Sequence, residues 1–168
     1  MCSFGPPDCR HTNRSGDCAA LLDLQKVAPA CLGKVAPKDF CDWQAKADSQ
    51  QIFCRGGRVK GIALEPCSLM LLPASIGDLT GLKGLDVAFN RLTSLPASIG
   101  GLTGMIGLDL NNNSLTTLPA SLSNLTGVMA TSADGNPGLA TCFSDGSNRD
   151  QRSQTNIRAP PKTAKRTA

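Results

Sequence analysis

Eight cysteines and one histidine are the side chains of this 168-residue chain best suited to metal binding or nucleophilic chemistry. Zinc sites need closely spaced thiolates and imidazoles, as in Cys-x-x-Cys pairs. The cysteines are not spaced in that way, and His11 has no second histidine with which to share a metal or activate a nucleophile. We therefore expect no metal site, no cofactor and no catalysis.

The cysteines crowd towards one end of the chain. Such crowding indicates a disulfide-stapled cap and an oxidising, extracellular or cell-surface location. Three N-glycosylation sequons favour the same location, at Asn13, Asn112 and Asn124. The first residues, MCSFGPPDCRHTN, lack the apolar stretch of a signal peptide. Either a signal lies upstream of this sequence, or the protein is cytoplasmic with reduced thiols, which is the alternative. We expect no membrane span. Six cysteines precede residue 55: Cys2, Cys9, Cys18, Cys31, Cys41 and Cys54.

A period of 23 residues positions the polar residues that follow the cap. The hexapeptide LPASIG begins at Leu72 and again at Leu95, and the same offset relates apolar and asparagine positions over about four units in residues 59–138. Each unit has an apolar face that only stacking against a neighbour can bury. The pattern predicts one strand per unit, followed by a turn, an irregular or helical segment, and the next strand. The corresponding positions of two units are Leu82, Leu85, Val87, Asn90 and Leu92, and Met105, Leu108, Leu110, Asn113 and Leu115.

Two sets of polar residues follow from this register. The first set lies where each unit turns, and its side chains should bond the backbone of neighbouring units as a ladder; it comprises Cys67, Asn90, Asn113 and Asn136. The second set points outwards from the strands onto a small, mildly acidic face that we expect to lack large aromatic side chains. A basic protein or peptide would suit this face. The candidate ligand-binding residues are Lys60, Glu65, Lys83, Asp86, Asp109, Asn111 and Asp134.

The repeated positions resemble the leucine-rich repeat family. The length of 23 residues and the pattern LTSLPxSIGxLTxLxxLDL are most similar to the typical and Ras-group classes of that family. The resemblance implies an α/β solenoid, a short right-handed coil with a parallel β-sheet on its concave face. It also implies recognition of a protein or peptide.

The segment before the repeats resembles the N-terminal cap of plant-type extracellular leucine-rich repeat proteins. The likeness rests on the apolar helix around Leu21, Leu22 and Leu24, for which Asp17 is a candidate N-cap, on Cys41 and Trp43, and on Cys54, Arg58 and Val59. It implies a disulfide between Cys41 and Cys54, with Cys18 and Cys31 as further candidates. After the repeats, Asn136, Gly138 and Leu139 are similar to the C-terminal cap of the same proteins, although Cys142 comes late.

Four segments are therefore expected: an N-terminal extension, 1–16; a Cys-rich cap, 17–58; about four repeats with a partial C-terminal cap, 59–142; and a basic tail, 143–168, whose composition predicts disorder. The tail has no interleaved aromatic residues, so we expect no nucleic-acid binding. The leading hypothesis is a secreted or receptor-like recognition module in signalling or defence. An intracellular Ras-group-like scaffold is the alternative, and an ice-binding repeat sheet is the third.

Overall fold

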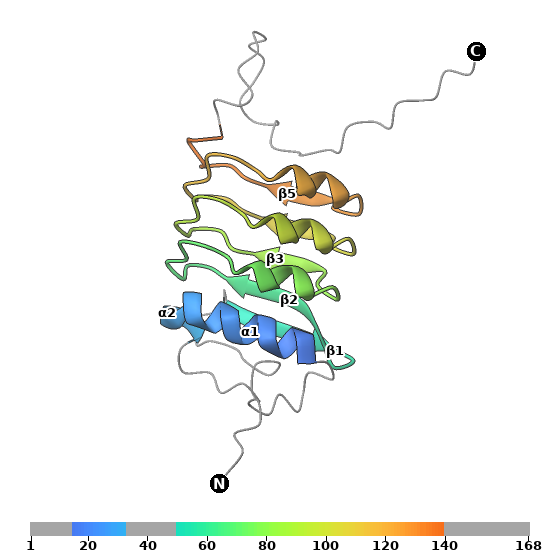
Figure 1. Ribbon diagram of the computed structural model, residues 1–168. Coiled ribbons are helices and arrows are strands. Elements are labelled where there is room, and N and C mark those ends of the chain that lie inside the picture. The colour runs from blue at the N-terminus through green and yellow to red at the C-terminus, as the bar shows by residue number, and fades with distance from the viewer. Residues whose placement is uncertain (1–14, 33–49, 140–168) are drawn as a thin grey trace, which may run out of the picture.

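One five-stranded sheet organises the chain. The computed structural model describes residues 15–32 and 50–139. The strands lie in chain order: β1 (Gln50–Arg55), β2 (Arg58–Leu64), β3 (Gly84–Asp86), β4 (Gly107–Asp109) and β5 (Ala130–Ser132). β1 and β2 form an antiparallel hairpin, and β2 to β5 are parallel. The fold is thus mixed α/β with a parallel sheet, as the 23-residue pattern predicts (Figure 1).

A short 3-10 helix follows each of β2, β3 and β4. These helices are η2 (Ala74–Asp78), η3 (Ala97–Gly101) and η4 (Ala120–Asn124), and each is preceded by a proline. They form a second layer across from the strands (Figure 1). Neighbouring 3-10 helices pack closely because Ser98 Oγ donates to Ala74 O at 2.6 Å and Gly77 carries no side chain. A Cβ added at Gly77 would lie 2.4 Å from Ser98 O, so this contact requires glycine.

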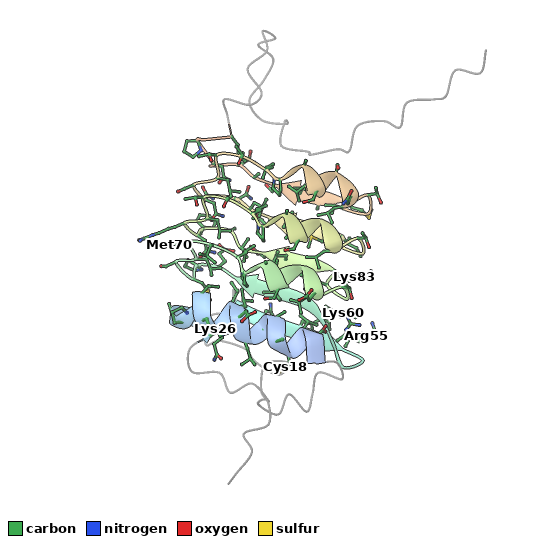
Figure 2. The ribbon with its side chains drawn as sticks, viewed as in Figure 1. Cys18, Lys26, Arg55, Lys60, Met70 and Lys83 are labelled. Carbon is green, nitrogen blue, oxygen red and sulfur yellow. A yellow bond between two sulfur atoms is a disulfide. The ribbon has the colours of Figure 1, made fainter. Side chains whose placement is uncertain are left out.

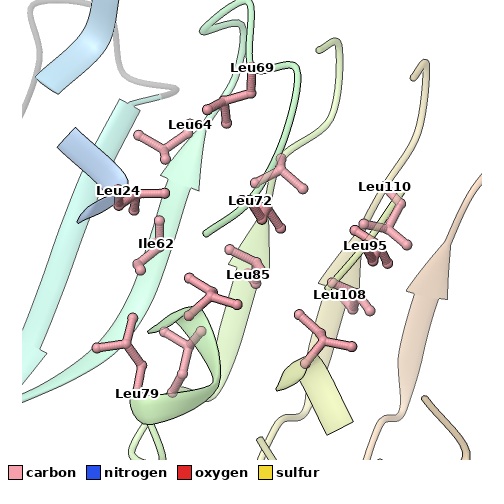
Figure 3. Close-up of a cluster of buried hydrophobic side chains, with 14 of the residues drawn as sticks. Leu24, Ile62, Leu64, Leu69, Leu72, Leu79, Leu85, Leu95, Leu108 and Leu110 are labelled. Carbon is pink, nitrogen blue, oxygen red and sulfur yellow. The ribbon is translucent and has the colours of Figure 1, made fainter. Parts of the chain in front are cut away.

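The core fills the space between the two layers with aliphatic side chains. Leu79, Leu82 and Leu85 of one unit are buried, and their counterparts one unit later are buried too. Figure 3 shows the leucines of successive units lying side by side between strands and 3-10 helices. Since each unit buries its apolar face only against the next, the stack is stabilised by contacts between units. The last unit is more open, because Leu118, Leu122 and Val128 are only partly buried.

Buried asparagines join the turns of successive units. Asn90 Oδ1 accepts hydrogen bonds from Cys67 N and Leu69 N, both at 2.9 Å, and its Nδ2 donates to Leu64 O at 2.8 Å. Asn113 repeats this arrangement one unit later, between Leu92 N and Val87 O. Each amide therefore satisfies backbone groups of its own unit and of the preceding one, which would otherwise be buried without partners.

Cys67 differs from the other residues at the expected ladder positions. Its sulfur forms a disulfide with Cys31, with the two Cα atoms 5.6 Å apart. Only its backbone N–H takes part in the ladder, through Asn90. The expectation that the Cys67 side chain replaces an asparagine was therefore wrong. The bond links helix α2 (Pro29–Leu32) to the turn after β2, so Cys31 has its partner in the first repeat and not in the cap.

The N-terminal helix closes the first end of the stack. Helix α1 (Ser15–Val27) lies beside η2, and Ala20, Leu21 and Leu24 are buried against the core (Figures 1 and 3). Asp17 is not the N-cap that the sequence predicted, because the helix begins at Ser15. Cys18 and Cys54 are each disulfide-bonded. Cys41 lies outside the described residues, so its pairing with Cys54 stays a prediction. No helix in the described part of the chain has the length and apolarity to cross a membrane.

Candidate ligand-binding face

Two rows of outward-facing residues run across all five strands. Backbone register aligns Phe53, Gly61, Gly84, Gly107 and Ala130 in the first row. The second row is Gln51, Ala63, Asp86, Asp109 and Ser132. Together with Met129 these rows line a shallow depression of ≈ 870 Å³, which we call the trough. The trough crosses the strands, so it follows the direction in which the units stack.

The floor of the trough is bare backbone at Gly84 and Gly107. Neither glycine has a positive φ, and a Cβ added to either would meet nothing within 4 Å. Glycine in the interior of a strand weakens it, and it often marks a place where a ligand or another backbone approaches closely. These two residues thus differ from Gly77, which the packing of the 3-10 helices requires. No packing contact within residues 15–32 and 50–139 requires glycine at either position.

Apolar side chains stand at both ends of the trough. Phe53 lies on β1, opposite Gly61 of β2, and is 57% exposed. Met129 directly precedes β5 and is 84% exposed. Ile106, 47% exposed, is the neighbour of Met129, whose N–H donates to Ile106 O at 2.9 Å. The expectation of a face without large aromatics was wrong, because β1 extends the sheet and carries Phe53 onto it.

A sequence signal for Phe53 did exist. Gly56 and Gly57 separate two apolar runs, which is the mark of a two-residue hairpin. Both glycines have positive φ, 61° and 66°, as a type I′ turn requires. Recognising that hairpin would have placed residues 50–55 antiparallel to the first repeat strand and Phe53 on the sheet face.

Acidic side chains flank the middle of the trough. Asp86 and Asp109 are paired in register on β3 and β4. Burial, followed by the charges of Asp86 and Asp109, raises the pKa of Glu65 above its usual value. We call these three residues the acidic cluster. Asp86 Oδ1 accepts from Ala88 N at 3.0 Å and Asp109 Oδ1 from Asn111 N at 2.9 Å, so both carboxylates are held at the ends of their strands.

The other predicted site residues lie around the trough, not among its lining residues. Asn111 Oδ1 accepts from Ser132 Oγ and from the backbone N–H of Asp134, both at 2.7 Å, and so holds the neighbouring turn in place. Lys83 Nζ donates to Gly104 O at 2.9 Å and is directed to the turn before β4. Lys60, Lys83 and Arg55 gather on one edge of the molecule (Figure 2). The face therefore has a basic edge and an acidic interior.

The remaining predictions concern metals and glycans. Within residues 15–32 and 50–139, no group of three His, Cys, Asp or Glu side chains could hold a metal ion. Asn124 is exposed at the end of η4, and Asn112 is exposed in a turn with a φ of 51°. Asn13 lies outside the described residues. Both described sequons are accessible to modification, and neither lies in the trough.

Comparison with known proteins supports the fold. No protein-family model matches the chain. No curated protein matches it either. Among solved structures, PEPR1-AtPEP1 aligns with 70% of this chain and 17% of its own, at 24% identity and a TM-score of 0.57. A leucine-rich repeat protein of Leptospira interrogans aligns with 52% of this chain and 24% of its own, at 30% identity and a TM-score of 0.47.

The likeness to PEPR1-AtPEP1 bears on the fold and not on the activity. The chain spans at most about a quarter of the length of either structure. The alignment with PEPR1-AtPEP1 covers most of the chain at low identity, so it shows a shared fold alone. Together with the 23-residue register and the stacked parallel strands, it supports a leucine-rich repeat fold.

Proposed function

We propose that this chain is a leucine-rich repeat solenoid that binds an extended protein or peptide segment in the trough, without catalysis. The observation that carries the proposal is the bare floor at Gly84 and Gly107, which weakens two strands without serving their packing. An extended backbone laid across the strands could approach this floor closely. Phe53 and Met129 offer apolar contacts at its two ends.

Charge defines the preferred ligand further. The acidic cluster favours a ligand with a lysine or arginine near the middle of the bound segment. A side chain of that kind would also relieve the repulsion by Asp86 and Asp109 that, after burial, raises the pKa of Glu65. The neighbour PEPR1-AtPEP1 is consistent with a peptide as the ligand. The proposed ligand is therefore a basic segment with apolar residues on both sides of its charge.

The proposed setting is extracellular, as part of a secreted or receptor-like protein with a plant-type, disulfide-stapled cap and a role in signalling or defence. The support is the Cys31–Cys67 disulfide together with the bonded state of Cys18 and Cys54. Disulfides of this number persist mainly in oxidising compartments. Titration of free thiols in protein purified from its source without reductant tests the setting. Reduced Cys31 and Cys67 would favour the intracellular scaffold.

Selection from a random peptide library tests the binding function. The full chain is immobilised, and enriched peptides are measured for affinity against the wild type and Gly107→Val. We expect the enriched peptides to be basic. Gly107→Val should lower their affinity by at least about tenfold, because the valine side chain fills the floor of the trough. Ala97→Val, an exposed change on η3, is the matched control and should bind as the wild type does. Enriched peptides that bind Gly107→Val equally well would refute the trough as the site.

A further inference from the structure

The acidic cluster has no positive partner in the described part of the chain. The ion pairs there are Lys26 with Asp23 and Arg58 with Asp17, and both lie away from the trough. Lys83, on the same face, is directed to Gly104 O. Asp86 and Asp109 thus lie side by side in register, and their charges act on Glu65, with no cation paired to them in the described residues. A basic side chain from another part of the chain, or a cation from another molecule, would balance these charges.

The chain itself contains a segment of opposite charge. Residues 144–168 carry six basic side chains against two acidic ones, a net charge of +4. The basic residues are Arg149, Arg152, Arg158, Lys162, Lys165 and Arg166. The rest of the chain is neutral overall, so this segment holds the whole excess charge. Its composition therefore complements the acidic cluster.

The length of the segment makes contact between the two feasible. The described chain ends at Leu139, after β5 at one end of the stack (Figure 1), and Met129, which lines the trough, directly precedes β5. From β5 to β3, where Asp86 lies, is two strand spacings, or about 10 Å. An extended chain covers ~3.3 Å per residue, so the segment is several times longer than this distance.

We propose that the basic segment 144–168 binds in the trough of its own chain and competes there with an outside ligand. The only large apolar side chain of the segment is Ile157, so it cannot contact both Phe53 and Met129, and a ligand with apolar residues on both sides of its charge displaces it. Binding within one chain also acts at a high effective concentration, of the order of 1 mM for a short flexible connection. A weak electrostatic contact is enough to occupy the trough under those conditions. The segment thus raises the concentration at which an outside ligand occupies the trough.

A labelled copy of the segment tests this inference in the full chain. The probe is a fluorescent synthetic peptide of residues 144–168, and its affinity is measured by anisotropy at low salt. The comparison is between the wild type and a variant with Arg158, Lys162, Lys165 and Arg166 changed to glutamine. If the chain's own segment has an intrinsic Kd of ~100 μM, its effective concentration of about 1 mM raises the apparent Kd of the probe about tenfold in the wild type. We expect the variant to bind the probe that much more tightly, and the difference to shrink in high salt.

Two further substitutions in the neutralised variant locate the contact. Asp109→Asn removes one charge from the acidic cluster while keeping an oxygen that can accept from Asn111 N. This change should lower the affinity for the probe. Asp78→Asn removes the same charge from η2, outside the trough, and should leave the affinity for the probe unchanged. Equal probe affinity for wild type and neutralised variant, or no binding to either, would overturn the inference. So would an Asp78→Asn effect as large as that of Asp109→Asn.

Crosslinking with a carbodiimide distinguishes one chain from two. We expect Lys162 or Lys165 to be joined to Glu65, Asp86 or Asp109 within monomers. Crosslinks found only between copies would overturn the intramolecular form of the inference. These tests need no outside ligand, so their failure leaves the proposed binding function to be judged by the peptide selection. Failure of that selection, in turn, leaves the probe measurements interpretable.

Discussion

Asp17 on helix α1 and Arg58 on strand β2 are joined across 41 positions of sequence, with Arg58 Nε 3.0 Å from Asp17 Oδ2. The same oxygen accepts a hydrogen bond from the buried N–H of Val59 at 3.1 Å. One carboxylate therefore fastens the N-terminal helix to the first parallel strand. Since Asp17 is buried, the contact replaces water at two donors.

Asp17→Ala should destabilise the chain because it leaves the Val59 N–H buried without an acceptor. The cost of such a group is about 1–3 kcal/mol in the free energy of unfolding. Urea unfolding of the two proteins measures it. Asp23→Ala is the matched control on the same helix, where the carboxylate pairs with the exposed Lys26 and accepts from Ser75 Oγ at 2.9 Å, so that its loss leaves no buried backbone group without a partner. Its effect should be clearly smaller, and equal effects would show that Asp17 does not hold the helix to the sheet.

Asn113→Ala should be among the most damaging single changes in the repeats. The side chain accepts from Leu92 N and donates to Val87 O and Leu110 O, all three in the buried interior. Each stranded backbone group costs about 1–3 kcal/mol. Asn112→Gly is the control, because Asn112 is exposed and its φ of 51° suits glycine. We expect a large fall in melting temperature for the first and almost none for the second; the reverse order would contradict the observed register.

Gly107→Ala and Gly100→Ala should change stability in opposite directions. A Cβ at position 107 meets nothing, so alanine should stabilise the strand by about 0.5–1 kcal/mol. A Cβ at position 100 would lie 2.5 Å from Ser121 O, so alanine there must push two 3-10 helices apart, at ~1–3 kcal/mol. Chemical unfolding measures both changes. A destabilised Gly107→Ala would mean that the strand itself needs glycine, and the case for a ligand would lose its main support.

Glu65→Gln should stabilise the chain at neutral pH and less so in acid. The pKa of Glu65 is raised above its usual 4.5, so the folded chain holds this proton more tightly than the unfolded chain does. Stability is therefore lost as the pH rises from 4.5 through the raised value. Glutamine stays neutral, so the gain in melting temperature over the wild type should be larger at pH 7 than at pH 4. In an Asp86→Asn, Asp109→Asn background the gain at pH 7 should shrink, and an unchanged gain would exclude those neighbours as a cause.

Cleavage of the Cys31–Cys67 disulfide should weaken the connection between α2 and the first repeat. The bond closes a loop over a separation of 36 residues, for which the chain-entropy estimate is roughly 4 kcal/mol. Peptide mapping without reduction should recover Cys31 joined to Cys67, and the same map tests the predicted pairing of Cys41 with Cys54. Unfolding of Cys31→Ser with Cys67→Ser measures the energy. Recovery of Cys31 joined to Cys18 would contradict the structure.

The sequence by itself determined the features that recur every 23 residues. The burial of Leu82 and Leu85, the turn positions of Asn90 and Asn113, and the alignment of Asp86 with Asp109 all follow from one offset. The physical reason is that each unit repeats the same local conformation and meets only its neighbours. A pattern visible in one unit therefore predicts its place in the next, and the sum of units specifies the sheet.

Only the tertiary structure decided what the period does not repeat. Phe53 reaches the trough because a hairpin outside the repeats pairs with the first parallel strand. Cys31 forms a disulfide with Cys67 across 36 positions, and Asp17 accepts a hydrogen bond from Arg58 across 41 positions. Such contacts depend on how the cap docks onto the stack, and no periodic signal marks them. The same holds for the openness of Gly84 and Gly107: the sequence places them in one column, but only the packed chain shows that no described residue lies within 4 Å of a Cβ added to either.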